Sequence, residues 1–236
     1  MILILAATPL ETALLRKRIS SQQTSACGSY QIFNGTLQGL EVLLAHGGIG
    51  TVNMASQLTT LLHEHSPQTV FLVGCGGSYP GSQLQIGNLA LAATEIYGDL
   101  GVMTAEGFIP LEQLKLPQDH SLAPLVQQQF DLDTDLLAWA QEILPEAVCG
   151  PFVTLNCCSG NPEMSEKIAQ RTGGICENME GAAAAQVCSA FDLPLLELRG
   201  ISNPTGTRDP EQWDIIKGAE AAQLGILELL QNWPVA

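Results

Sequence analysis

Basic residues are scarce in this sequence. Its 236 residues include 9 Lys and Arg against 24 Asp and Glu, a formal net charge of −15. Nucleic acids and anionic membrane surfaces are bound by clustered Lys and Arg, so the charge balance argues against both as partners. Charged residues make up only 14% of the chain and hydrophobic residues 46%, which excludes intrinsic disorder. We expect one globular domain over residues 1–236.

Long hydrophobic runs and zinc-type cysteine patterns are also lacking. The apolar start at residues 1–6 has no positive charge before it, and Glu11 follows too soon for a signal peptide. No other segment approaches the roughly 20 apolar residues of a membrane span. The 7 cysteines form no C-x-x-C pair, and the 4 histidines have no zinc-type spacing beside them. We therefore expect a cytoplasmic protein with reduced thiols and no metal.

Short apolar runs alternate with segments of helical periodicity. We expect strands at residues 1–6, 40–45, 69–73, 88–95, 148–155, 175–178 and 195–198. We expect helices that begin after Thr8 and at residues 52–62, 132–144, 163–171, 180–190 and 211–232. The alternation predicts an α/β fold with helices on both faces of a central sheet. Residues 97–121 look less regular and are expected to form an excursion near a site or an interface.

Polar residues follow three of the expected strands. They are Glu11 after the first strand, residues 74–78 after the third, and Ser202-Asn203 after the penultimate one. Because ligands of open α/β sheets bind beyond the carboxyl ends of strands, we expect these residues to surround a site.

The glycines at residues 48–50 do not make a dinucleotide-binding fingerprint. That fingerprint needs a further glycine where Asn53 stands, and an acidic residue about 20 positions later at a strand end. A tight turn between strand and helix explains the glycines, and a close approach of the backbone to a small ligand is the alternative.

Two glutamates stand at expected helix starts, where capping alone would explain them. Thr8-x-x-Glu11 is a capping-box pattern, and Glu180 opens an alanine-rich helix whose dipole favours a carboxylate. The four alanines after Gly181 allow close packing, which would hold the Glu180 carboxylate rigidly enough to recognise a vicinal diol. The thiols at residues 157 and 158 have no basic neighbour in sequence, so buried packing is expected there.

Five short motifs, taken in order, resemble the nucleoside phosphorylase/nucleosidase superfamily. They are Ala6-Ala7…Glu11, Gly48-Ile49-Gly50, Gly74-Cys75-Gly76-Gly77, Asn178-Met179-Glu180 and Arg199-Gly200-Ile201-Ser202-Asn203. The match covers nearly the whole chain and is weakest over residues 97–145. The resemblance implies a single-domain three-layer α/β sandwich with a central mixed sheet flanked by helices. It also implies cleavage of the N-glycosidic bond of a purine nucleoside without a cofactor, by a homodimer or larger homo-oligomer.

The resemblance also implies roles for individual residues. Glu180 matches the glutamate that accepts hydrogen bonds from the ribose hydroxyls, and Met179 matches the residue packed beneath the sugar. Glu11 matches the acid that orients and deprotonates the attacking water. The remaining matches lie along the base and ribose or near the base pocket: Gly76, Gly77, Ser78, Cys157 and Cys158.

Two departures from the superfamily's patterns narrow the reaction. The phosphorylases carry a phosphate-binding Arg just before the glycine motif, whereas Leu72 and Val73 stand there in this sequence. Water is therefore favoured over phosphate as the nucleophile. Adenine-specific nucleosidases carry an Asp acid where this chain has Asn203, and an amide cannot protonate a base. Because its NH₂ group can donate to a 6-oxo group, Asn203 favours hypoxanthine or guanine.

Within the superfamily, the chain most resembles the futalosine hydrolases, which release hypoxanthine from futalosine on a menaquinone route. The loop at residues 203–209 followed by Trp213 also matches that family. Arg208 is expected either to pair with the benzoate at the 5′ end of futalosine or to pair with Asp209. The alternatives are a methylthioadenosine/S-adenosylhomocysteine nucleosidase, a purine nucleoside phosphorylase and a nucleoside-binding module without turnover.

Overall fold

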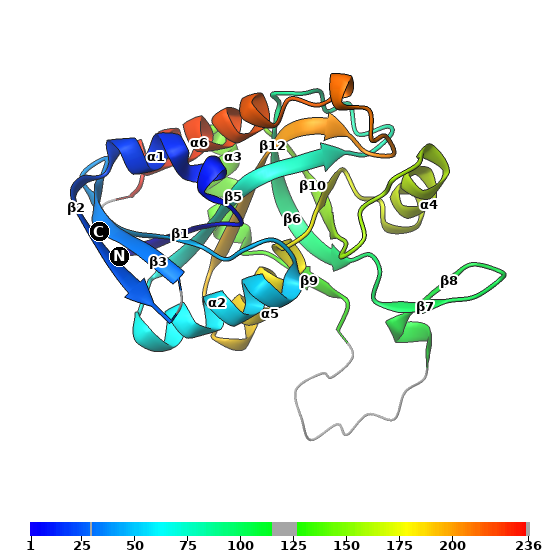
Figure 1. Cartoon of the computed structure of the whole chain (residues 1–236), viewed down its shortest axis with the longest axis horizontal. Helices are drawn as coiled ribbons and strands as arrows, with labels where there is room; N and C mark the ends of the chain where they lie inside the picture. The colour runs from blue at the N-terminus through cyan, green and yellow to red at the C-terminus, as the bar shows by residue number, and fades with distance from the viewer. Residues whose placement is uncertain (29, 115–126, 235–236) are drawn as a thin grey trace.

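The computed structural model describes residues 1–28, 30–114 and 127–234. Its main sheet is mixed and has the strand order β11-β10-β6-β12-β5-β1-β4-β3-β2, with β9 paired to β6 (Figure 1). The strands of this sheet are β1 (Ile2–Ala6), β2 (Ser20–Cys27), β3 (Tyr30–Leu37), β4 (Leu40–His46), β5 (Thr69–Ser78), β6 (Leu89–Tyr97), β9 (Gln129–Asp131), β10 (Val148–Thr154), β11 (Cys176–Asn178) and β12 (Leu195–Pro204).

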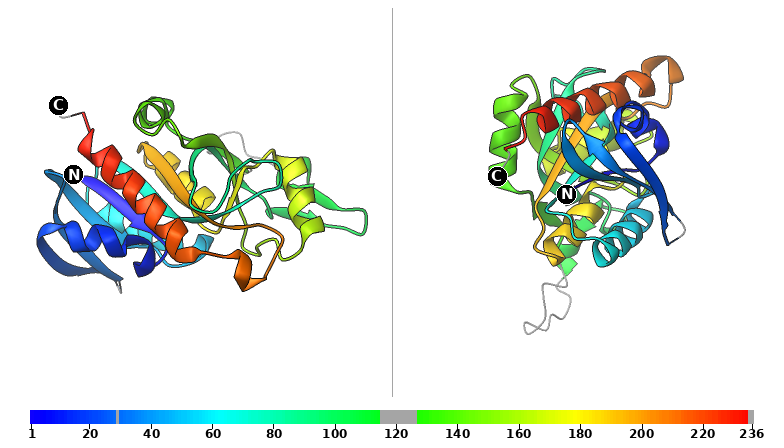
Figure 2. Two further views of the ribbon diagram at one scale, coloured as in Figure 1. Left: turned by 90° about the horizontal axis from the view of Figure 1, so that it is seen from above. Right: turned by 90° about the vertical axis from the view of Figure 1, so that its left-hand side faces the viewer.

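Helices cover both faces of the sheet, which confirms the expected α/β fold class. The helices are α1 (Ala13–Arg18), α2 (Thr51–Glu64), α3 (Thr134–Ile143), α4 (Pro162–Thr172), α5 (Gly181–Ala190) and α6 (Ile215–Gln231). Helices α2 and α5 lie together on one face, and α1 and α6 lie on the other (Figures 1 and 2).

Strand β1 shows why the central strands are apolar throughout. Leu3 and Leu5 pack into the core cluster that contains α2 and α5 residues. Ile2 and Ile4 pack into the cluster on the opposite face, with residues of α1, α3 and α6. Because alternate side chains of a strand point to opposite faces, burial of both faces requires a continuous apolar run.

The sheet closes on itself at the end that carries the candidate site. Strand β11 pairs with β10 and also with β5, so β5, β11, β10, β6 and β12 form a ring. Strands β5 and β12, which are ten residues long, pair in parallel within this ring. The ring therefore brings together segments that are far apart in the sequence.

The glycine motif was expected to follow the strand at residues 69–73, but it is part of that strand. Strand β5 continues through it to Ser78, and Gly77 pairs with residues of both β11 and β12. A Cβ atom on Gly76 would overlap Cys176 Sγ, and one on Gly77 would lie 2.8 Å from Thr205 Cγ2. Glycine is required here because neighbouring side chains lie against the strand, not because the chain turns.

Other boundaries also differ from the expected ones. The hairpin of β2 and β3 was not anticipated, because β2 is polar and exposed along most of its length. The helix expected after Thr8 is a 3₁₀ turn, η1 (Pro9–Thr12), followed by α1. The closing helix starts at Ile215, after a further turn, η3 (Pro210–Gln212).

The irregular segment expected over residues 97–121 is described as far as residue 114. It forms a separate two-stranded sheet of β7 (Gly101–Met103) and β8 (Phe108–Pro110), followed by η2 (Leu111–Leu114). Residues 115–121 lie outside the described residues. A role at an interface stays a prediction, as does the oligomeric state. No helix within the described ranges is long and apolar enough to cross a membrane.

Candidate active site

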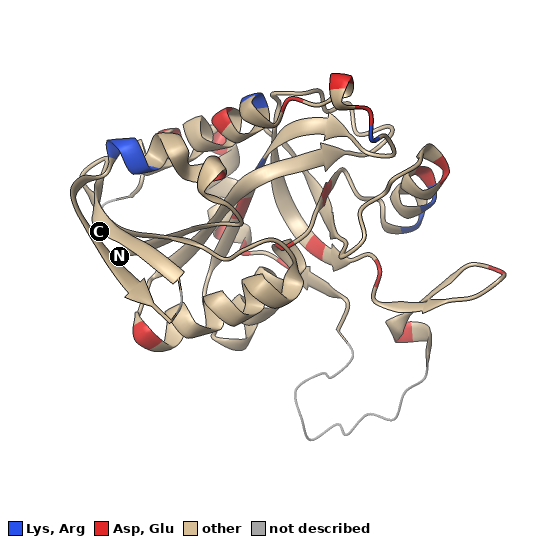
Figure 3. Ribbon diagram, viewed as in Figure 1, with Lys and Arg blue, Asp and Glu red and all other residues tan. Residues whose placement is uncertain are grey.

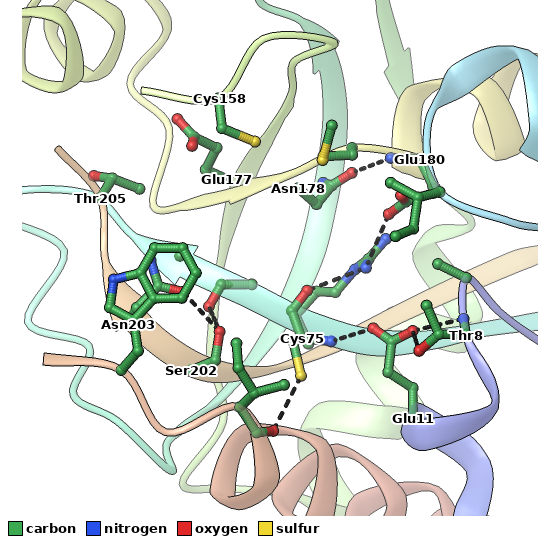
Figure 4. A pocket seen from close by; sticks show the side chains of 18 of the residues that line it. Thr8, Glu11, Cys75, Cys158, Glu177, Asn178, Glu180, Ser202, Asn203 and Thr205 are labelled. Carbon is green, nitrogen blue, oxygen red and sulfur yellow. Dashed lines mark hydrogen bonds and ion pairs between the residues drawn. The ribbon is translucent and has the colours of Figure 1, made fainter. Parts of the chain in front are cut away.

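A cavity of about 330 Å³ opens where β5, β11 and β12 end beside η1 (Figure 4). It is lined by eight of the ten expected site residues: Glu11, Gly76, Gly77, Cys158, Met179, Glu180, Asn203 and Arg208. The other two do not line it. Ser78 is buried beside the cavity, where its carbonyl accepts from Thr205, and Cys157 is exposed to solvent.

Glu11 is both a capping residue and a cavity residue. Its Oε2 accepts hydrogen bonds from the Thr8 N–H and the Thr8 hydroxyl, each at 2.9 Å. Its Oε1 accepts from the Cys75 N–H on β5, also at 2.9 Å. The two oxygens tie η1 to the central strand, so capping fixes the orientation of a carboxylate that lines the cavity.

Glu180 is buried at the start of α5. Its Oε1 accepts from the Gly50 N–H at 3.0 Å, and its Oε2 lies 3.4 Å from Arg199 Nη1. Gly48 and Gly50 both have positive φ, as the tight turn required, and the turn aims the Gly50 N–H at the carboxylate. Burial raises the pKa of Glu180, while Arg199 and the Gly50 N–H act in the opposite direction.

Arg199 places a cation beside the glycine motif, where the sequence predicted none. No Arg precedes Gly74 in sequence, yet the Arg199 guanidinium on β12 lies beside Gly74, with Nη1 3.2 Å from the Cys75 carbonyl oxygen. Its Nε donates to Glu197 at 2.8 Å. Burial disfavours the Arg199 charge, but Glu197, Glu180 and Glu11 together raise its pKa. The cation is thus held by carboxylates of the chain itself, so it is poorly suited to binding phosphate.

Gly74 lets these charged groups meet. A Cβ atom at this position would lie 2.5 Å from Glu11 Oε1 and 2.8 Å from Arg199 Nη1. Carboxylate and guanidinium therefore converge over the bare Cα of Gly74. The residue is extended, so the requirement for glycine here is steric rather than conformational.

Two further carboxylates lie behind the cavity. Glu95 on β6 and Glu197 on β12 are fully buried, and their carboxyl oxygens occupy the space that a side chain at Gly181 would need. Burial, followed by the charge of Glu197, raises the pKa of Glu95 well above its usual value. Glu197 Oε2 has no hydrogen-bond partner among the described residues, so it can accept a hydrogen bond from a protonated Glu95 carboxyl.

The Glu95 carboxyl is connected to the start of α5. It accepts from Thr154 Oγ1 at 2.7 Å and from Asn178 Nδ2. Asn178 Oδ1 in turn accepts from the Glu180 and Gly181 N–H groups, at 2.9 and 2.7 Å. The buried acid therefore orients the amide that caps α5 and fixes the backbone of Glu180.

Asn203 lies on the opposite side of the cavity from Glu11 and is held by its neighbours (Figure 4). Its Oδ1 accepts from the Ser202 hydroxyl at 2.8 Å, and its Nδ2 donates to the Pro204 carbonyl at 2.9 Å. The Asn203 amide therefore has a fixed orientation. Both of its polar groups keep capacity for one more hydrogen bond.

Cys158 and Glu177 line the cavity near Asn203 and Thr205. Burial, Glu177 and Glu180 raise the pKa of Cys158 to about 12, so its thiol is not reactive. Glu177 was not identified from the sequence. Its Oε2 accepts from the Tyr79 hydroxyl at 2.8 Å and from the Ser159 hydroxyl, and its Oε1 accepts from the Ser159 N–H at 3.1 Å.

Arg208 lies at the edge of the cavity with Trp213. Its guanidinium carbon is 4.4 Å from the centre of the Trp213 ring, and both residues line the cavity. Within the described ranges Arg208 makes no ion pair with Asp209, which instead accepts from the Glu211 N–H at 3.0 Å. Apart from Arg199 on β12, the other basic residues of the described ranges lie on α1, α4 and α6 (Figure 3). Arg208 is thus an exposed cation placed at the cavity by an aromatic ring.

Comparison with known proteins identifies the family. The sequence profile of the Phosphorylase superfamily matches residues 1–231. The chain belongs to this superfamily. It is 29% identical over 217 residues to the 5′-methylthioadenosine/S-adenosylhomocysteine nucleosidase of Tolumonas auensis, with 89% of each chain covered. It is 32% identical over 197 residues to the futalosine hydrolase of Thermus thermophilus, covering 82% of this chain and 83% of that one.

Solved structures show the same fold. The nucleosidase of Neisseria meningitidis, in complex with methylthio-immucillin-A, aligns with a TM-score of 0.84 at 21% identity, covering 98% of each chain. An Asp-to-Asn variant of the Helicobacter pylori nucleosidase, with 5′-methylthioadenosine in its active site, aligns at 0.85 and 21% identity, also covering 98% of each chain. The curated relatives are nucleosidases and a hydrolase, which confirms the expected enzyme class, one that hydrolyses N-glycosidic bonds.

Proposed function

We propose that the purine nucleoside hydrolysed by this chain carries a 6-oxo base, as futalosine does, and that hypoxanthine is released. The observation that carries this proposal is Asn203, an amide in the cavity at the position where adenine-specific members of the superfamily carry an acid. The Asn203 NH₂ group can donate to O6, and its carbonyl oxygen can accept from a protonated N7. The relative from Thermus thermophilus supports this choice.

In the proposed reaction, the bond from C1′ to the base breaks as the sugar gains positive charge. The electron pair of that bond leaves with the base, whose N7 takes up a proton from solvent water, so neutral hypoxanthine is released. Glu11, which is held by Thr8 and Cys75, takes a proton from water as the water attacks C1′. Glu180 accepts from the ribose hydroxyls, and the carboxylates around the sugar stabilise its charge. Arg199 favours the ionised form of Glu180 and so acts against the effect of its burial. No step requires a cofactor.

A second candidate is a methylthioadenosine/S-adenosylhomocysteine nucleosidase, which the comparisons favour by the number of relatives that carry this name. Most of the curated relatives carry that name, including those of Tolumonas auensis and Aeromonas salmonicida at 29% identity. The apolar cavity residues Leu10, Ile49 and Ile215 would suit a methylthio group. The two candidates differ in both the base and the 5′ group of the substrate.

Four substrates separate these candidates: futalosine, its 6-amino counterpart, methylthioinosine and methylthioadenosine. They combine two bases with two 5′ groups. Each is incubated with the enzyme, with and without phosphate, and the released base is quantified by chromatography. We expect faster release of hypoxanthine than of adenine for each 5′ group, and no dependence on phosphate. Faster release of adenine would overturn the proposal in favour of the second candidate, and a requirement for phosphate would indicate a phosphorylase.

A further inference from the structure

Glu177 is a buried carboxylate in the cavity to which the reaction as described gives no role. It lies on β11, where it pairs with Gly77 of β5, and Gly77 also pairs with Asn203 of β12. Directly paired residues on neighbouring strands project to the same face, and strands lie about 4.8 Å apart. Glu177 and Asn203 therefore flank the bare Cα of Gly77 from its two sides, and all three residues line the cavity.

The hydrogen bonds of Glu177 leave an acceptor position for a ligand. A carboxylate offers about four acceptor positions. Here the Tyr79 hydroxyl takes one, and the hydroxyl and N–H of Ser159 take two more. Burial and the neighbouring Glu177 raise the pKa of Tyr79, so the phenol stays a donor. No Lys or Arg pairs with Glu177 in the described part of the chain.

The two kinds of purine differ at the atom that such an acceptor would meet. A 6-oxopurine carries a hydrogen on N1, which a carboxylate attracts. Adenine presents a bare N1 lone pair, which a carboxylate repels. If a base lies over Gly77 with its O6 and N7 toward Asn203 on β12, its N1 edge faces the β11 side of Gly77, where Glu177 lies.

We propose that Glu177 accepts a hydrogen bond from N1–H of the base and so selects 6-oxopurines together with Asn203. This inference rests on the proposed function, because it assigns the second half of base recognition to the same cavity. Tyr79 and Ser159 are positioning residues, since they hold the Glu177 carboxylate in one orientation. The selection is by attraction of one base and repulsion of the other.

The test compares Glu177→Gln with the wild type on the four substrates named above. Glu166→Gln on α4 is the matched control, because Glu166 is exposed and, among the described residues, accepts only from Gln170 of its own helix. The amide of Glu177→Gln can accept from N1–H or donate to a bare N1. We expect the ratio of kcat/KM for 6-oxo over 6-amino substrates to fall at least 30-fold at each 5′ group. The control should leave the ratio unchanged.

The failure of this inference is distinguishable from failure of the proposed function. If the wild type prefers 6-amino substrates, the proposed function is wrong and the inference falls with it. If the wild type prefers 6-oxo substrates and Glu177→Gln keeps the same ratio, only the inference is overturned. If the variant does not fold, as judged by circular dichroism, inhibition of the wild type by free bases decides the matter. Hypoxanthine should inhibit at least 30-fold more strongly than 1-methylhypoxanthine, and equal inhibition would overturn the inference.

Discussion

The raised pKa of Glu95 should make the stability of this protein fall as the pH rises. The Glu95 pKa is raised by burial and by Glu197, whereas in the unfolded chain a glutamate titrates near 4.3. A raised folded pKa stabilises the protein fully below the unfolded pKa, and this contribution is lost as the pH rises toward the folded pKa. While the folded protein keeps a proton that the unfolded chain has lost, the free energy of unfolding falls by about 1.4 kcal/mol per pH unit.

Glu95→Gln removes this titration. An amide has only one acceptor oxygen, so the variant loses the hydrogen bond from either Thr154 or Asn178. That loss does not vary with pH. Urea denaturation of the wild type and the variant at pH 6, 6.5 and 7 measures the difference in their free energies of unfolding. We expect this difference to shift in favour of the variant as the pH rises, by up to about 1.4 kcal/mol per pH unit. Glu166→Gln should show the same pH dependence as the wild type. A pH-independent difference between Glu95→Gln and the wild type would refute the raised pKa of Glu95.

Three other substitutions test separate parts of the site. Gly74→Ala places a methyl group 2.5 Å from Glu11 Oε1 and 2.8 Å from Arg199 Nη1, so kcat should fall by about 100-fold or more; activity within tenfold of wild type would show that the two groups need not converge. Asn203→Asp should shift the ratio of kcat/KM toward 6-amino substrates by at least tenfold in the four-substrate assay, and an unchanged ratio would contradict the role given to the amide. Arg208→Ala should raise KM for futalosine by about tenfold and leave KM for methylthioinosine unchanged, since of these two substrates only futalosine carries a carboxylate. Equal changes in both KM values would argue for a structural role beside Trp213.

Strand and helix patterns, and with them much of the cavity, could be predicted from the sequence because they are local. The buried strands carry unbroken apolar runs, and Glu11 and Glu180 stand at junctions between strand and helix. The roles of Arg199 and Glu177 could not be predicted in the same way, because partners such as Cys75 and Tyr79 lie far from them in the sequence. The one local signal is the spacing of Glu197 and Arg199, since charges two apart in a buried strand face the same side.

The glycine motif is a second feature whose role could not be predicted from the sequence alone. Gly74, Gly76 and Gly77 suggest a turn when read along the chain, because turns are where glycine is most often required. In the folded protein each lies in an extended strand, and its missing side chain makes room for a group from another element.

Cys157 and Cys158 illustrate a simpler ambiguity. Only Cys158 faces the cavity, and the sequence alone could not determine which of two adjacent residues would do so.

The closed ring of strands has a consequence for how this protein is made. Strand β12 lies between β5 and β6 in the sheet but is the last strand along the chain. While the ribosome is still synthesising residues before Leu195, the facing edges of β5 and β6 have no partner, and unpaired edges invite pairing with other chains. Asn203 and Arg199 belong to this strand, so the synthesis of β12 completes the site and covers the facing edges of β5 and β6 in one late step. Premature termination before β12 should therefore yield an aggregating product rather than a weakly active one.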